Sequence, residues 1–186
     1  MKNKFILFIL ILFFFKNNLY SNELDINSNN IKVFKDSKEI KFTGNVKAKD
    51  INNNILKTNE AIYEKDKQLL KTLADTEITT ENKYQIFGST IFFDNINKKI
   101  YSENPAKVLD IDGNEINVQN FQYSIKNNMF FSKGQIEVND VNKNNYFFSE
   151  IYIDEKKNKI VGTDVKAFLN QSDFKINEKN EPRFFS

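Results

Sequence analysis

Apolar and polar residues alternate with a period of two over long stretches of the chain. Ile116 and Val118 flank one polar residue, and Ile136 and Val138 do the same. A period of two places every second side chain on the same face of an extended strand. Ile, Val, Phe, Tyr and Thr, which favour β structure, dominate these stretches. The pattern predicts strands with one buried face each.

The alternation recurs every thirty residues. Segment 91–104 has the same order of apolar, acidic, Asn/Lys-rich and apolar positions as segment 151–164. Three columns at this spacing are apolar or aromatic in every unit: Ala61, Ile91, Phe121 and Ile151; Tyr63, Phe93, Tyr123 and Ile153; Leu70, Ile100, Phe130 and Ile160. A fourth column holds only small residues: Thr72, Ser102, Ser132 and Gly162. The fixed period predicts copies of one structural unit.

Polar clusters typical of turns separate the strands at two points in each unit. One series is DINNN at 50–54, ENK at 81–83, DIDGNE at 110–115 and VNKNN at 141–145. The other is EKDKQ at 64–68, DNINKK at 94–99, KNN at 126–128 and DEKKNK at 154–159. Asn, Asp, Gly and Lys supply the turn chemistry. Each unit is therefore predicted to be strand, turn, strand, turn, in an antiparallel, all-β meander.

The apolar face changes sides once in each unit. Ile116 and Val118 have one parity, and Phe121 and Tyr123 have the other. A one-residue β-bulge at the change would bend the strand and keep both halves facing one way. The alternative is that each strand crosses there between two sheet faces. We favour the bulge and expect it at residues 60, 90, 120 and 150.

The N-terminus has the features of a secretory signal peptide. Lys2 and Lys4 precede an apolar run over residues 5–15, and Lys16 ends it. A helix of that length rises only ~16 Å, too short for a hydrocarbon core of ~30 Å. We expect residues 1–21 to be removed on export, with the small residue Ser21 near the cleavage point.

Charge does not favour a nucleic-acid partner. Without the three lysines of residues 1–21, the chain has 24 basic residues against 25 acidic ones. A nucleic-acid binder needs a clustered positive face, so we expect no nucleic-acid partner. The chain has no cysteine, so a packed core rather than disulfides must stabilise it.

Candidate catalytic chemistry is scarce. The chain has no His or Cys, which excludes Ser-His-Asp and Cys-His catalysis and the zinc sites built on these residues. Glu64, Asp94 and Asp154 share one repeat position, and paired carboxylates can hydrolyse glycosides. These acids recur at turn starts, where acids commonly cap the backbone, and we favour that interpretation. We therefore expect no enzyme activity and no cofactor.

Segment 110–121 superficially resembles a calcium loop. Such a loop needs Gly at its sixth position and a bidentate Glu at its twelfth. Here Gly113 is fourth and Phe121 is twelfth. We expect a tight hairpin turn at Asp112-Gly113 with a positive φ angle, and no metal site.

Aromatic residues are frequent, with 19 Phe and 7 Tyr. They can simply fill a core. A single curved sheet, however, buries its apolar face only by folding over on itself, and such a sheet can also enclose a long apolar ligand. The pattern alone leaves both interpretations open.

Short motifs resemble those of the OstA-like family of lipopolysaccharide transport. FTGNV at 42–46 matches the opening box of the OstA-like repeat, and AIY at 61–63 resembles the element that follows it. SKGQI at 132–136 is similar to a second copy of the box, and EIY at 150–152 to a second copy of the other element. The resemblance covers about residues 31–170.

The resemblance implies a fold and a function. Members of the family form a periplasmic bridge that carries lipopolysaccharide to the outer membrane. They are twisted, open β-jelly rolls of antiparallel strands whose hydrophobic groove shelters acyl chains. Their domains join edge to edge by strand addition, which makes exposed strand edges a working interface. The implied partners are lipopolysaccharide, other OstA-like domains and outer-membrane assembly partners.

The family has two versions that bear on this chain. One is the short, soluble, LptA-like bridge, and the other is the N-terminal domain of the outer-membrane translocon, LptD. The tail NEPRFFS at 180–186 resembles the continuation of the translocon beyond its jelly roll. We therefore lean towards the translocon domain.

These observations give a division of the chain and a set of site residues. We expect a signal peptide at 1–21, an N-terminal segment leading into the first strand at 22–39, a jelly roll at 40–170 and a tail at 171–186. The recurring apolar columns are the candidates to line a lipid groove: Leu56, Tyr63, Ile86, Ile91, Phe93, Ile116, Val118, Phe121, Tyr123, Phe148, Ile151 and Ile153. The alternative is a structural or adhesive β-repeat protein of the cell envelope with a closed, dry core.

Overall fold

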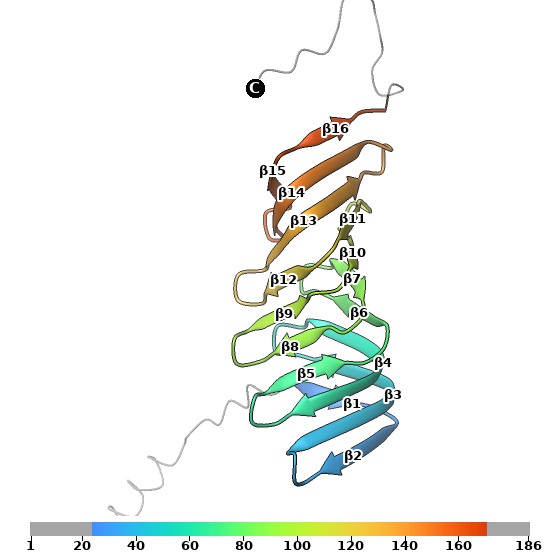
Figure 1. The fold of residues 1–186 in the computed structure, drawn as a ribbon, viewed down its shortest axis with the longest axis vertical. Coiled ribbons are helices and arrows are strands. Elements are labelled where there is room, and N and C mark those ends of the chain that lie inside the picture. Colours follow the sequence, from blue (N-terminus) through green and yellow to red (C-terminus); the bar gives the residue numbers. More distant parts are fainter. Residues whose placement is uncertain (1–23, 171–186) are drawn as a thin grey trace, which may run out of the picture.

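The protein is built entirely of antiparallel strands in the part that the structure, a computed structural model, describes, residues 24–170. The strands are β1 (Asp25–Asn27), β2 (Asn30–Phe34), β3 (Glu39–Lys49), β4 (Ile55–Glu64), β5 (Leu69–Thr72), β6 (Thr76–Thr79), β7 (Gln85–Gly88), β8 (Phe92–Asp94), β9 (Lys99–Ser102), β10 (Ala106–Leu109), β11 (Glu115–Val118), β12 (Phe121–Ser124), β13 (Met129–Asn139), β14 (Asn145–Asp154), β15 (Lys159–Thr163) and β16 (Lys166–Phe168). Figure 1 shows them stacked along the long axis, from β2 at the bottom to β16 at the top. The predicted all-β jelly roll is confirmed.

The strands form one sheet that is folded into two layers. The front layer contains β2, β5, β8, β9, β12 and β15, and the back layer contains β1, β6, β7, β10, β11 and β16. The long strands β3, β4, β13 and β14 belong to both, because one half of each pairs in the front layer and the other half in the back layer. The apolar side chains of both layers form a single core between them. We call the line where the chain passes between layers the seam.

The thirty-residue unit is one front hairpin followed by one back hairpin. Its turns place a residue in the left-handed region at the same repeat position each time. In the front turns these residues are Lys38, Gln68, Lys98, Asn128 and Asn158, and in the back turns they are Asn53, Lys83, Gly113 and Lys143. The expected turn at Gly113, with a φ of 88°, is therefore present. The predicted order of strand, turn, strand, turn is confirmed.

The change of parity marks the crossing from one layer to the other, so our preference for a bulge at residues 60, 90, 120 and 150 is wrong. Thr90 and Asn120 lie in short breaks between strands, while β4 and β14 run unbroken through Glu60 and Glu150. The register shifts lie on the partner strands instead, between Thr43 and Val46 of β3 and between Lys133 and Ile136 of β13. Both segments contain a glycine with positive φ, which can adopt the bend without a steric penalty.

Three residues of the column of small residues have hydroxyl groups, and these bond backbone amides and carbonyls that lose their strand partners where the chain crosses between the layers. The Thr72 hydroxyl accepts a hydrogen bond from the Ile91 amide at 2.8 Å. The Ser132 hydroxyl donates to the Asn120 carbonyl at 2.7 Å, and Ser102 donates to the carbonyls of Ser89 and Thr90, both at 3.3 Å. Buried backbone groups without partners would be costly, so this column keeps the seam intact.

The back turns are held by a repeated aspartate–asparagine motif. Asp50 accepts the amides of Asn52 and Asn54 at 2.9 and 2.8 Å and the Asn54 side chain at 2.7 Å. The side-chain oxygen of Asn54 (Oδ1) then accepts a hydrogen bond from the backbone amide of Glu81 in the next turn. The pairs Asp110–Asn114 and Asp140–Asn144 repeat the arrangement. Each turn is thereby bonded within itself and to its neighbour.

The sheet begins before residue 40, where we placed the start of the jelly roll. Strands β1 and β2 pair with β3 and form its first edges. The expected signal peptide and tail lie outside the described residues. Within residues 24–170, no helix is long and apolar enough to cross a membrane.

We predict that Asp50→Ala lowers the free energy of unfolding by about 1–3 kcal/mol, because two amides and one side-chain amide lose a charged acceptor. Urea unfolding measures the loss. Asp36→Ala, at an exposed turn position, serves as the control and should stay within about 0.5 kcal/mol of the parent. Equal stability of the two variants would show that the motif does not hold the turn.

Candidate functional site

The interior between the two layers holds the residues that we expected to line a lipid groove. Ten of the twelve are at most 3% exposed: Leu56, Ile86, Ile91, Phe93, Ile116, Val118, Phe121, Tyr123, Ile151 and Ile153. Tyr63 and Phe148 are partly exposed. The fold brings all twelve to the inner faces of the two layers. Ten of them form closed core, and their role in lipid binding stays a prediction.

The interior opens at its N-terminal end. A cavity of about 530 Å³ is lined there by Leu24, Ile26, Ile40, Phe42 and Tyr63, with Lys65 and Gln68 at the front turn. Ile26 comes from β1 in the back layer, and Ile40 comes from β3 in the front layer, so the two layers contribute opposite walls. Aliphatic and aromatic side chains in the wall and the basic Lys65 at the rim suit a molecule with an apolar chain and an anionic head.

The interior is also partly exposed at its C-terminal end. Tyr146 and Phe148 of β14 pack against the core but are not fully buried. Phe148 lies against Gly162 of β15 so closely that a Cβ atom there would be 2.3 Å from its ring. Ile160, in the same strand, pairs with Ile153 and is 36% exposed, so the apolar column reaches the last edge of the front layer. The column therefore runs from the N-terminal cavity to partly exposed side chains at the C-terminal end.

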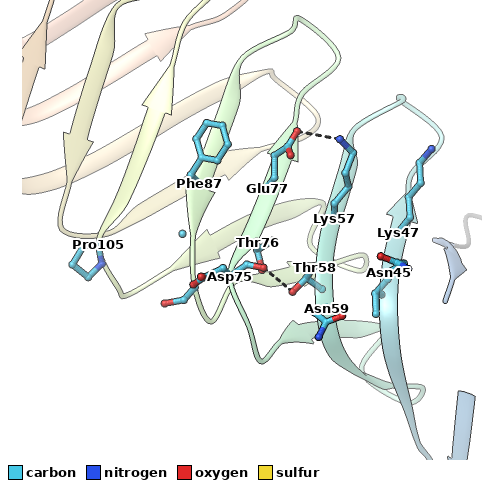
Figure 2. Close-up of a pocket in the computed structure, with 13 residues that line it drawn as sticks. Asn45, Lys47, Lys57, Thr58, Asn59, Asp75, Thr76, Glu77, Phe87 and Pro105 are labelled. Carbon is cyan, nitrogen blue, oxygen red and sulfur yellow. Dashed lines mark hydrogen bonds and ion pairs between the residues drawn. The ribbon is translucent and has the colours of Figure 1, made fainter. Parts of the chain in front are cut away.

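A larger hollow of about 860 Å³ lies outside the core, where the back layer meets the seam. Its wall carries charged and hydroxyl groups: Lys57 forms an ion pair with Glu77 at 3.2 Å, and the Thr58 hydroxyl donates to the Asp75 carbonyl at 3.0 Å (Figure 2). These groups would have to lose their contact with water if an acyl chain lay against them. The hollow is therefore a poorer candidate for lipid than the N-terminal cavity.

The front and back turns lie on the side of the molecule opposite the seam, and we call this side the mouth. Between the two ends of the column, polar side chains join the front turns to the back turns across the mouth. The Tyr84 hydroxyl donates to Asn158 at 2.7 Å, and the Asn158 side chain donates to Asp112 at 2.8 Å. The Asn128 side chain donates to Glu81 at 3.0 Å. Each of these bonds links a back turn to a front turn.

Glu155 stands at the centre of this arrangement and is only 5% exposed. Its carboxyl accepts hydrogen bonds from the Tyr123 hydroxyl at 3.0 Å, from Asn82 at 3.3 Å and from the Thr80 hydroxyl. Burial raises its pKa to about 7, and the neighbouring Glu81 adds to the rise, although the hydrogen bonds oppose it. The mouth cluster is the set Thr80, Glu81, Asn82, Tyr84, Asp112, Tyr123, Asn128, Glu155 and Asn158.

Burial also raises the pKa values of the two tyrosines of the mouth cluster. Burial raises the pKa of Tyr84 to about 12, with the carboxylates of Asp110 and Glu155 as further causes. Burial and the Glu155 carboxylate raise the pKa of Tyr123 as well. Both phenols therefore stay protonated at physiological pH and act as hydrogen-bond donors, Tyr84 across the mouth to Asn158 and Tyr123 to Glu155.

The mouth cluster was not expected from the sequence, although one back turn departs from the repeat. Thr80 and Tyr84 stand where the other back turns have Asp and Asn. This departure from the repeat is a point where side chains reach across the mouth.

The acids that we considered for catalysis each serve their own turn. Asp94 accepts the amide and the side chain of Asn97 at 2.8 and 2.7 Å. Asp154 and Glu64 form ion pairs with lysines three residues later. Within the described part of the chain, no group of three or more acidic residues could hold a metal ion.

Comparison with known proteins places the chain among lipopolysaccharide-assembly proteins. The model of a family described as lipopolysaccharide-assembly, LptC-related, matches residues 5–101. A solved structure, LptH from Pseudomonas aeruginosa, the LptA-homologous periplasmic component of the lipopolysaccharide transport device, matches at 11% identity with a TM-score of 0.33. That match covers 81% of this chain and 96% of LptH. No curated protein matches.

We predict that Glu155→Gln removes a fall in stability between about pH 4.5 and 7. The folded chain holds the Glu155 proton more tightly than the unfolded chain does, since its pKa of about 7 exceeds the ordinary 4.5. Stability from this group is therefore greatest at low pH, declines through that window and is lowest above pH 7. The variant should be more stable at pH 8 by up to roughly 3 kcal/mol.

Urea unfolding at several pH values between 4 and 8 measures this effect. Glu103→Gln, at an exposed position near the seam, is the matched control and should follow the parent curve. If Glu155→Gln also follows the parent curve, burial does not raise the pKa of Glu155 in the folded protein.

Proposed function

The chain belongs to the LptC-related family of lipopolysaccharide assembly, and we propose that it holds lipopolysaccharide by its acyl chains and passes it on towards the outer membrane. The observation that carries this proposal is the cavity at the N-terminal end, where Leu24, Ile26, Ile40 and Phe42 continue the column of apolar residues between the layers. An acyl chain in that cavity would leave its anionic head near Lys65 at the rim.

Exposed edges at both ends support a place in a chain of similar domains. In the described structure β1 and β2 pair only with β3, while β15 and β16 pair only with β14. The edge strands carry exposed apolar side chains, including Ile31, Val33, Val161 and Phe168. Edges of this kind accept a further strand readily. We propose that OstA-like domains of the transport bridge, and outer-membrane assembly partners, add at these edges.

We further propose that the chain works in the periplasm after removal of residues 1–21. The family assignment supports the location, and the charge and apolar pattern of the N-terminus supports export. Between a soluble bridge and a translocon domain, the tail at 180–186 favours the translocon domain.

A photoreactive side chain in place of Ile40 should crosslink to lipopolysaccharide, because Ile40 lines the N-terminal cavity. The matched control is the same group in place of Lys41, the next residue of β3, whose side chain points to the outer face and pairs with Glu60. Crosslinking is measured on denaturing gels after illumination of the full chain with lipopolysaccharide. We expect labelling at position 40 and background at position 41.

Equal labelling at the two positions would indicate adsorption to the surface rather than binding in the cavity. A folded protein that is labelled at neither position would favour the alternative, a structural or adhesive β-repeat protein with a dry core. Circular dichroism of each variant establishes that the protein is folded before the comparison is made.

Export should shorten the chain. When the complete coding sequence is expressed in a Gram-negative host, we expect the periplasmic product to start close to residue 22, as measured by intact mass. Replacing an apolar residue of the 5–15 run, such as Leu10, with Arg should leave the precursor uncut in the cytoplasm. A full-length product anchored in the membrane would contradict cleavage while leaving the proposed lipid binding untouched.

A further inference from the structure

We propose that the mouth cluster is a clasp that holds the two layers together, and that it must open before an acyl chain can enter the interior beyond the N-terminal cavity. The inference rests on the proposed function, because it concerns how lipid reaches the rest of the same interior. In the units that the mouth cluster spans, the interior contains Phe121, which is 3% exposed and lies towards the seam.

The first argument is position. The clasp joins the back turns at 80–84 and 110–114 to the front turns at 126–128 and 154–159. The front turn of the N-terminal cavity, with Lys65 and Gln68, instead borders an opening. The mouth is therefore open next to the first unit and closed by hydrogen bonds in the units that follow.

The second argument is the chemistry of the closure. The bonds that join the front turns to the back turns across the mouth are hydrogen bonds between side chains, at 2.7–3.3 Å. Such bonds are exchanged for bonds to water at small net cost when the partners separate, whereas separating apolar surfaces exposes them. A polar closure over an apolar interior can therefore open without unfolding the layers themselves.

The third argument comes from the repeat. The other back turns have an Asp–Asn pair whose hydrogen bonds stay among the back turns. Such a pair would be enough if the turn at 80–84 had only to stack on its neighbours. Thr80 and Tyr84 give up that pair and bond to Glu155 and Asn158 across the mouth instead. Glu155 follows Lys65, Asn95 and Ile125 at its repeat position, and its carboxyl accepts a hydrogen bond from Asn82 across the mouth. The departure at Thr80 and Tyr84 therefore serves the cross-layer contact.

Tethering tests the proposal in the full chain. The chain has no cysteine, so Asp112→Cys with Asn158→Cys introduces the only two thiols, at side chains that are bonded at 2.8 Å in the closed state. A short bifunctional thiol reagent joins them, and Asp112→Cys alone with the same reagent is the control. Photoreactive groups in place of Ile40 and, separately, Phe121 report lipopolysaccharide in the N-terminal cavity and in the clasped part of the interior.

We expect tethering to abolish labelling at position 121 and to leave labelling at position 40 unchanged. Tyr84→Phe removes one hydroxyl at nearly constant volume and should increase labelling at position 121 about five-fold, the population change that loss of one hydrogen bond of ordinary net strength produces. Tyr101→Phe, on the outer face of β9, is the matched control and should change nothing.

Other results overturn the proposal in distinguishable ways. If position 121 is labelled equally with and without the tether, lipid does not pass the clasp. If position 40 is labelled but position 121 never is, even in folded Tyr84→Phe, the clasped interior is permanent core. Failure at position 40 in every variant would instead remove the proposed function on which the clasp depends.

Discussion

The crossing of the chain between two layers is the constraint on which the rest of this structure depends. A strand that leaves one layer for the other must break its ladder of hydrogen bonds, and the released amides and carbonyls are buried. Thr72, Ser102 and Ser132 provide the partners, each with a hydroxyl at the same repeat position. These three side chains are small, and their hydroxyls can donate to a carbonyl or accept from an amide. The thirty-residue period is thus fixed at the seam.

Because the seam fixes the period, the two rows of turns opposite it can vary. In the front row, backbone amides bond to the carbonyl of the preceding turn, as Asn95 does to Gln68 and Glu155 to Asn128. In the back row, asparagine side chains make the equivalent link. These ladders stabilise each row by itself and leave the distance between the rows to other side chains. The mouth cluster is where that distance is set.

Much of the fold could be predicted from the sequence because each inner position repeats. The period of two gave the strands, and the period of thirty identified the columns that are now seen in the core, such as Ile91, Phe121 and Ile151. The bulge was placed on the wrong strand, since parity alone does not distinguish a bulge from a crossing between layers. Glycines at 44 and 134 with positive φ were the residues that marked the bulges. The mouth cluster was missed because it consists of contacts between units, which a comparison of aligned columns does not reveal.

The columns that repeat and the residues that depart from the repeat have different physical roles. A repeated apolar residue lowers the free energy of the fold in every unit alike, so it gives no information about where the layers separate. A residue such as Glu155 is costly to bury, and its burial raises its pKa to about 7. A packed core tolerates a buried carboxyl group of this kind only where neighbouring groups form hydrogen bonds with it. The fold tolerates that cost at the mouth cluster, where side chains from the turns of its two layers meet, and a polar contact there is reversible in a way that an apolar contact is not.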